Sequence, residues 1–99
     1  MTDHQTVWKF PFTVADAFTL DMPRDARVLC VHVQNETPCM WALVFPGNPL
    51  EPRRFACFGT GRRIATPGEY VGTFQLLDGR FVGHVFEVEI SPKKLAILD

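Results

Sequence analysis

The sequence predicts one all-β domain, a sandwich or partly closed barrel of about seven short antiparallel strands. Short runs rich in Val, Leu and aromatic residues recur along the chain, with turn signals about every eight to twelve residues. Nine Phe and two Trp are many for 99 residues, and large rings suit sheet cores and interfaces. The sequence shows no internal repeat and no long helical pattern. These observations favour a sheet protein with a single core.

The composition is that of an ordinary globular chain, with 46% apolar and 21% charged residues. Ten basic against eleven acidic residues give a net charge of −1, so no overall field attracts nucleic acid or an anionic membrane. Met1–Gln5 is polar and no run approaches the roughly 20 apolar residues of a membrane span, so we expect neither signal peptide nor membrane segment. Three cysteines, an odd number, indicate reduced thiols and a cytoplasmic location.

The first two strands precede the centre of the chain. We expect residues 1–5 to form a flexible end, followed by a strand at Thr6–Thr13 in which rings alternate with other side chains. Pro11 cannot donate a ladder hydrogen bond, which places this strand at a sheet edge. A short strand follows at Ala17–Met22. Its inward side chains are expected to be Phe18, Leu20 and Met22.

The stretch Arg27–Phe45 predicts the hairpin around which the rest of the domain is built. Its loop is expected at Asn35–Pro38, so that Gln34 pairs with Cys39. One face of this hairpin is wholly apolar and should lie in the core; it comprises Leu29, Val31, Val33, Met40, Ala42 and Val44. The other face is mixed, yet too apolar for water; it comprises Cys30, His32, Gln34, Cys39, Trp41 and Leu43. Two such faces are typical of the middle of a sandwich or of a surface that another subunit covers.

A loop and a further strand follow the central hairpin. Three Pro and one Gly predict the loop at Pro46–Pro52, and a strand is expected at Arg53–Phe58. Phe55 and Cys57 should share one side of that strand. The all-β domain is expected to span residues 6–90. Residues 91–99 should form a tail or a short helical turn that Ser91 caps, with the apolar run Leu95–Leu98 needing cover.

Asp78-Gly79 predicts a second hairpin, between strands at Tyr70–Leu76 and Phe81–Ile90. With a two-residue turn, Phe74 lies opposite Gly83, where a ring can cover the bare backbone of glycine. The same register predicts the cross-strand pairs Thr73–His84 and Tyr70–Glu87.

Five stretches of the sequence together carry a family resemblance. They are K-F-P-F near the start, L-C-V-H-V-Q-N-E-T-P-C-M-W-A-L-V in the middle, F-G-T-G, Y-V-G-T-F-Q-L, and H-V-F-E near the end. In these stretches the chain resembles a family of small proteins encoded by bacteriophages and prophages, a domain of unknown function. The resemblance spans Lys9 to Glu87. It implies a viral context, hence the host cell cytosol, and supplies no catalytic residue.

Cys30, His32 and Cys39 share one predicted face, and thiols with imidazole can bind zinc. Structural zinc sites usually use cysteines in pairs, whereas the thiols here are single. Free cysteine packs as a small hydrophobe, so core packing is favoured, and we predict no metal and no cofactor. His84 opposite Thr73 indicates a histidine held by a cross-strand hydroxyl, on the face opposite to Glu87.

Four arginines lie on the two sides of Gly59-Thr60-Gly61. A glycine turn can present N–H groups to an anion, and guanidinium groups bind phosphate in bidentate fashion. The P-loop pattern G-x-x-x-x-G-K-[ST] is missing, so a solvated turn with arginines beside acidic neighbours is the favoured alternative. Adjacent strand residues point to opposite faces, which leaves one arginine of each pair for a site. The predicted ligand-binding residues are Arg54, Gly59, Thr60, Gly61 and Arg62.

The sequence offers no activated nucleophile, no paired carboxylates and no metal set, so we expect a protein that is not an enzyme. The first hypothesis is a phage-type module that works through protein contacts as a homo-oligomer, most simply a dimer. It would act as a virion or accessory structural piece, or inhibit a host factor. The expected interface residues are Trp41, Leu95, Ile97 and Leu98. The alternative is a protein that sequesters a nucleotide or another phosphate-bearing small molecule; nucleic-acid and membrane partners are not expected.

Overall fold

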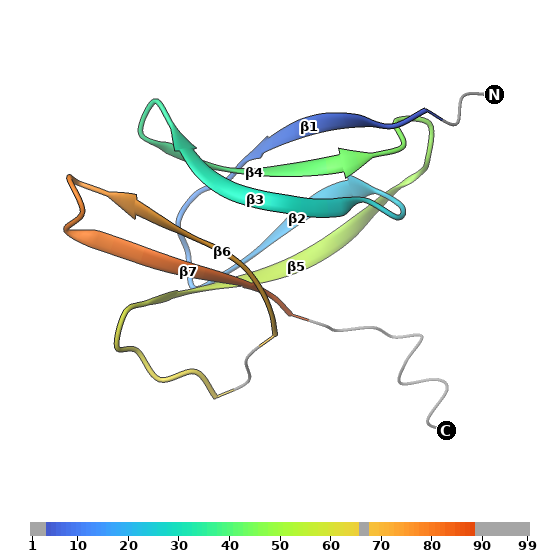
Figure 1. Cartoon of the computed structure of the whole chain (residues 1–99). Helices are drawn as coiled ribbons and strands as arrows, with labels where there is room; N and C mark the ends of the chain where they lie inside the picture. Colours follow the sequence, from blue (N-terminus) through green and yellow to red (C-terminus); the bar gives the residue numbers. More distant parts are fainter. Residues whose placement is uncertain (1–3, 66–67, 89–99) are drawn as a thin grey trace, which may run out of the picture.

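The computed structural model describes residues 4–65 and 68–88, which form two antiparallel sheets packed face to face (Figure 1). The strands are β1 (Thr6–Pro11), β2 (Ala17–Pro23), β3 (Arg27–Gln34), β4 (Thr37–Val44), β5 (Leu50–Gly59), β6 (Glu69–Leu76) and β7 (Phe81–Glu87). One sheet has the order β1-β4-β3 and the other β2-β5-β7-β6. The described ranges contain no helix and the sheets do not close into a barrel, which confirms the predicted sandwich. The predicted tail or helical turn at 91–99 lies outside the described residues.

The core lies between the sheets, where alternate side chains of each strand point inward. Phe12 stacks on Phe18 with ring centroids 4.5 Å apart, and it meets Phe74 edge-on at 5.8 Å. The largest fully buried side chains are Phe55, Met22, Met40, Val44, Val85 and Pro23. The expectation that Phe18, Leu20 and Met22 face inward is confirmed. The edge position of the first strand is confirmed as well, because β4 is the one described strand that pairs with β1.

The β3–β4 hairpin has a tighter turn than the sequence predicts. Gln34 pairs with Thr37, so the turn consists of two residues, Asn35 and Glu36, rather than four. Both have positive φ, 51° and 65°, as a type I′ turn requires. The predicted register is therefore wrong by two residues. Because an even shift keeps side chains on their faces, Trp41 still points outward as expected.

A bulge in β3 overturns one core prediction. The register shifts between Val28 and Cys30, which turns Leu29 outward until 44% of it is exposed. Val28 packs against the core instead. β6 carries a similar bulge between Tyr70 and Gly72, so Tyr70 pairs with Phe86 and not with Glu87 as predicted.

The register of the second hairpin is otherwise as predicted. Phe74 lies opposite Gly83 and Thr73 opposite His84. A Cβ at Gly83 would stand 2.7 Å from Cζ of Phe74, so the ring lies directly on the bare backbone. The two bulged edge strands also meet, because a Cβ at Gly72 would stand 3.2 Å from that of Val31. The residue at position 72 therefore sets how closely the sheets approach at this edge.

An ion pair ties three segments together at the end of β7. Arg53 donates to both carboxylate oxygens of Glu87 and, through Nη1, to the carbonyl oxygen of Ala26 at 2.9 Å. The hydrogen bond to Glu87 is the main reason that the pKa of Arg53 is raised. Because Ala26 directly precedes β3, this arginine connects the two sheets.

β5 begins at Leu50, although the sequence predicts a loop through Pro52. The backbone N–H of Val88 donates to the carbonyl oxygen of Arg54 at 2.8 Å, so the backbone groups of Arg54 point toward the β7 side. Alternation directs Pro52 to the same side, beyond the end of β7, where the missing N–H breaks no ladder bond with a described strand. Proline is therefore tolerated inside this strand, and the loop prediction is wrong for these residues.

Candidate functional site

Four of the five predicted ligand-binding residues form one turn at the end of β5. The backbone N–H of Arg62 donates to the carbonyl oxygen of Gly59 at 3.0 Å, and Gly61 has a φ of +88°, a conformation that favours glycine. The side-chain stem of Arg62 lies over Gly59, since a Cβ there would stand 3.6 Å from its Cγ. Thr60 Oγ1 lies 2.7 Å from Nε2 of His84. The turn is thus anchored to β7.

The structure does not bring Arg54 to this turn. Arg54 lies on the outer face of the four-stranded sheet, as expected, but five residues before Gly59 on an extended strand, about 16 Å away. It borders a different cavity of about 230 Å³, together with Thr19 and Val88. A single phosphate cannot contact Arg54 and the turn at once, so the predicted set separates into two places.

A chain of hydrogen bonds crosses the outer face of the four-stranded sheet. Tyr70 Oη lies 2.6 Å from Thr73 Oγ1, which lies 3.0 Å from Nδ1 of His84. Both ring nitrogens of His84 therefore have partners, one on each side. The predicted cross-strand hydroxyl is confirmed, and the Thr60 contact is one that sequence reasoning missed. Glu87 lies on the opposite face, as expected, paired with Arg53.

Three aromatic rings flank this chain on neighbouring strands. Phe86 on β7 has Phe58 of β5 at 5.9 Å on one side and Tyr70 of β6 at 5.6 Å on the other, both edge-to-face. Tyr70 is exposed, whereas the two phenylalanines are half-buried. The surface next to the glycine turn therefore combines rings with hydroxyl and imidazole groups.

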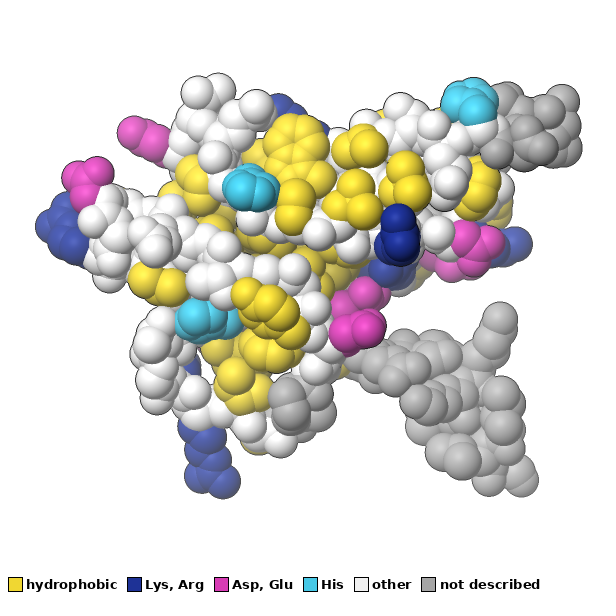
Figure 2. Space-filling view, viewed as in Figure 1, with side chains coloured by type: hydrophobic (Ala, Val, Ile, Leu, Met, Phe, Trp, Pro, Cys, Tyr) yellow, Lys and Arg dark blue, Asp and Glu magenta, His cyan; other side chains and the backbone are white. Residues whose placement is uncertain are grey.

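The outer surface of the three-stranded sheet holds the predicted interface residue Trp41. We call this surface the apolar outer face; it comprises Val7, Pro11, Cys30, Cys39, Trp41 and Leu43. Figure 2 shows hydrophobic side chains gathered over the part of the molecule where β1, β4 and β3 lie. Lys9 extends across it, with Nζ 5.9 Å from the Trp41 ring centroid and 2.6 Å from Oε1 of Gln34. Leu95, Ile97 and Leu98 lie outside the described residues.

The charges on the apolar outer face have one sign. The residues of these three strands that share the orientation of Trp41 include Lys9 and Arg27 and no acidic side chain. Val7 is 50% exposed, whereas Trp41 and Leu43 are half-buried. The apolar outer face therefore carries one cation over its middle, at Trp41, and a second at one end, Arg27.

The three thiols are divided between the sheets and form no disulfide. Cys30 and Cys39 lie on the apolar outer face with His32, whereas Cys57 points into the core from β5. Burial raises the pKa of the Cys57 thiol, with a further contribution from Asp16. Among the described residues, no three side chains of the metal-binding types come together.

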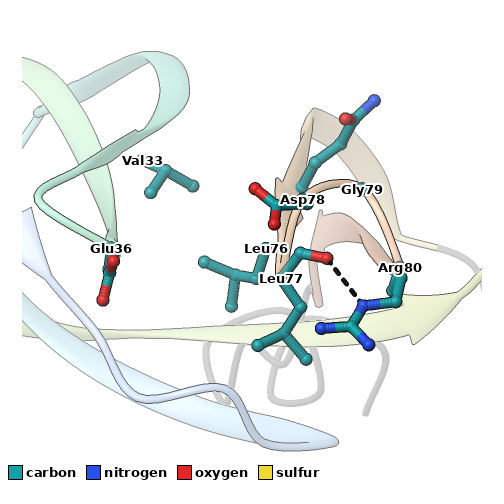
Figure 3. A pocket seen from close by; sticks show the side chains of 8 residues that line it. Val33, Glu36, Leu76, Leu77, Asp78, Gly79 and Arg80 are labelled. Carbon is teal, nitrogen blue, oxygen red and sulfur yellow. Dashed lines mark hydrogen bonds between the residues drawn. The ribbon is translucent and has the colours of Figure 1, made fainter.

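A pocket of about 680 Å³ lies between the tips of the two hairpins (Figure 3). Val33 and Glu36 line it from the β3–β4 side, and residues 75–80 from the β6–β7 side. Leu77 stands at its edge with a φ of 55° and 65% of its surface exposed. Sequence reasoning missed this pocket because it depends on how the two sheets place their hairpin tips.

The family model described as domain of unknown function (DUF7352) matches residues 3–95. The chain belongs to this family. The match covers every strand of the DUF7352 domain, both hairpin tips and the glycine turn. No curated protein and no solved structure matches the chain significantly. In the part of the domain that the structure describes, no helix is long and apolar enough to cross a bilayer.

Proposed function

We propose that this protein is a non-enzymatic binding module that acts through protein contacts, most simply as a homodimer. The apolar outer face carries this proposal. It exposes Val7 and part of Trp41 on a flat sheet surface, and no other described strand covers it. Burying such a face against another protein is favourable by about 25 cal/mol for each Å² of apolar surface removed from water.

The size of the face indicates that it is one part of the contact. Three strands spaced about 4.8 Å apart, with eight residues rising about 3.3 Å each, present roughly 14 by 26 Å. A stable complex usually buries about 800 Å² on each partner, which is more than this surface supplies. The apolar run Leu95–Leu98 is the natural source of the remainder.

The resemblance to phage and prophage proteins supports a viral setting for the module. In the cytosol of an infected cell, a small dimeric sheet protein could serve as a virion accessory piece or block a host factor. Both roles require the same property, a surface that binds another protein without catalysing a reaction.

Light scattering coupled to size-exclusion chromatography tests the homodimer. We expect twice the mass of one chain at micromolar concentration. Trp41→Lys should weaken association at least tenfold, because a further cation would enter the contact next to Lys9. Tyr70→Lys, an exposed ring on the other sheet, is the matched control and should leave the mass unchanged. A wild-type chain that is monomeric at micromolar concentration would rule out the homodimer.

A second candidate function is binding of a nucleotide or phosphate-bearing small molecule at the Gly59–Arg62 turn. The observation that favours it is the position of this turn, which directly follows the half-buried ring of Phe58 and bonds through Thr60 to His84. Because Arg54 lies apart, Arg62 would carry the phosphate contact and the rings would stack on a base.

Calorimetry with a panel of mono-, di- and cyclic nucleotides tests this second function. We expect measurable heat with at least one of them, and an affinity at least tenfold lower in Arg62→Ala. Arg54→Ala is the internal control and should have the smaller effect. Absence of heat with every nucleotide, or equal affinity in Arg62→Ala, would leave only the protein-contact function.

A further inference from the structure

We propose that the pocket between the hairpin tips binds a linear aliphatic diamine, with one ammonium group at Glu36 and the other at Asp78. The pocket shares no residue with the apolar outer face, so this inference goes beyond the protein contacts proposed above. It is carried by the volume of the cavity, its apolar wall and the position of two carboxylates on different hairpins.

An apolar wall separates the two carboxylates. Val33 and Leu76 are half-buried and supply this wall, and Leu77 extends it to the edge of the pocket. Figure 3 shows Val33 and Leu76 in the space between the two acidic residues, with Glu36 at one side and Asp78 at the other. A methylene chain that lies against the wall is removed from water, which favours binding.

The two carboxylates of the pocket are not neutralised by ion pairs. Among the described residues, neither Glu36 nor Asp78 takes part in a salt bridge. The cation of the lining, Arg80, donates instead through Nε to the carbonyl oxygen of Leu77 at 3.2 Å. Two free carboxylates at one cavity are suited to two ammonium groups of a ligand.

Two residues of the lining occupy backbone positions that favour glycine. Glu36 has a φ of 65° and Leu77 a φ of 55°, where a side chain is strained and glycine is not. Both side chains line the pocket. Residues in unfavourable backbone conformations are common at ligand sites, where the side chain serves binding at some cost to stability. The pocket thus keeps a carboxylate and an apolar side chain at two points where glycine would give a more stable turn.

A diamine is the small ligand that satisfies all of these features together. A cavity of about 680 Å³ lies within the range of roughly 300–1,000 Å³ that small-molecule sites usually have. A monoamine would leave one carboxylate without a partner, and a ligand without a methylene chain would leave the wall uncovered. Because Glu36 and Asp78 belong to different sheets, a bound diamine would bridge them. Both carboxylates are exposed, so binding should be weak and should decrease with added salt.

NMR titration of the nitrogen-15-labelled full chain at low salt tests the site, because amide shifts both detect and locate weak binding. The probes are 1,4-diaminobutane and 1,6-diaminohexane. The corresponding monoamines, 1-aminobutane and 1-aminohexane, are controls with the same carbon chains and one ammonium group. We expect saturable shifts at the amides of Glu36 and of residues 77–80. The better diamine should bind at least threefold more tightly than its monoamine.

A double variant, Glu36→Gln with Asp78→Asn, separates the pocket from general attraction to acidic surface. It should bind the diamine at least fivefold more weakly, since both ion pairs are lost. Asn tolerates the positive φ of Asp78, so the turn is kept. Asp21→Asn removes an exposed carboxylate on β2 and is the matched control, which should leave the affinity unchanged.

Each outcome of the titration decides for or against the diamine. Saturable shifts at the hairpin tips that the double variant weakens and Asp21→Asn does not are the supporting result. Absence of saturable shifts, or equal affinity for the double variant, overturns the site. Equal affinity for a diamine and its monoamine shows that a second ammonium group contributes nothing, and this overturns the ligand class. Shifts of equal size at Asp21 and at the hairpin tips indicate non-specific attraction and overturn the site as well.

Discussion

The β3–β4 and β6–β7 hairpins share one plan and differ on their outer surfaces. Both have turns with positive φ at residues other than glycine, and both have a bulge in the edge strand. On β6–β7 the outward polar groups bond to one another, from Tyr70 through Thr73 to His84. On β3–β4 the outward side chains include Cys39, buried to 2% exposure, and Trp41, with one lysine extended above them.

This difference shows which hairpin can face water unaided. Hydroxyl and imidazole groups that satisfy one another remain compatible with solvent on either side. Apolar side chains on a flat sheet gain free energy only when something covers them. Of the two hairpins, β3–β4 therefore has the outer face that gains more free energy from being covered.

Both hairpins are expected to bury their inner faces equally well. Phe74→Ala in β6 and Met40→Ala in β4 should each lower the free energy of unfolding by several kcal/mol, about 3–5 for the ring and about 2–5 for methionine. Both side chains are nearly or fully buried. Urea unfolding measures the effect, with the exposed neighbour Gln75→Ala as control, expected within about 0.5 kcal/mol. A loss below about 1 kcal/mol at either site would show that one inner face is not core.

A pair of valine substitutions tests the outer surfaces. Thr73→Val removes the hydroxyl between Tyr70 and His84 and should lower stability by about 0.5–1.5 kcal/mol. Cys30→Val on the apolar outer face breaks no hydrogen bond and should change it by less than about 0.5 kcal/mol. The urea midpoints of the two variants, measured in parallel, show whether Thr73→Val lowers stability more than Cys30→Val. Equal effects would mean that the hydrogen-bond chain contributes nothing.

The turns provide a smaller, stabilising effect. Glu36→Gly gives Asn-Gly, the preferred type I′ sequence, and should raise the free energy of unfolding by about 0.5–1 kcal/mol. Leu77→Gly should act in the same direction, since leucine at positive φ is strained. Thermal midpoints report both. Gly47→Ala is the unstrained reference, because a Cβ added at Gly47 would have no neighbour within 4 Å. A lower midpoint for Glu36→Gly would contradict the turn assignment.

The smallest effect concerns reactivity rather than stability. Cys30 is half-buried, Cys39 is buried, and the raised pKa of Cys57 leaves less thiolate at a given pH. Brief treatment of the folded chain with iodoacetamide should add one alkyl group, at Cys30, and denaturation should allow all three. Intact mass and peptide mapping identify the sites. Equal labelling of the three cysteines in the folded chain is the contrary result.

The sequence predicted what local rules determine. Asp78-Gly79 and the Phe74–Gly83 pair set the register of the second hairpin, and Pro11 placed β1 at an edge. The errors at Leu29 and Tyr70 have one cause. Both bulges lie in edge strands, β3 and β6, which meet where the two sheets come together. This contact joins residues far apart in sequence, so the sequence of either strand alone does not predict the bulge.

The candidate sites divide in the same way. The Gly59–Arg62 turn consists of neighbouring residues and was predictable. Arg54 lies away from it because five residues of extended strand separate the two. The pocket between the hairpin tips involves residues from both sheets, so no run of sequence contains it. Trp41 was predictable because alternation fixes its face even when the register is wrong by two.

Pro52 has a consequence for the behaviour of the chain at high concentration. Among the described residues, no strand pairs with β5 at Pro52 on the side that faces away from β2, and unpaired strand edges recruit strands from other molecules. At Pro52, an incoming strand would find a carbonyl oxygen as acceptor but no backbone N–H as donor. The new pair of strands would therefore lack one ladder hydrogen bond. Pro52 thus disfavours edge-to-edge pairing with another molecule at this point of β5.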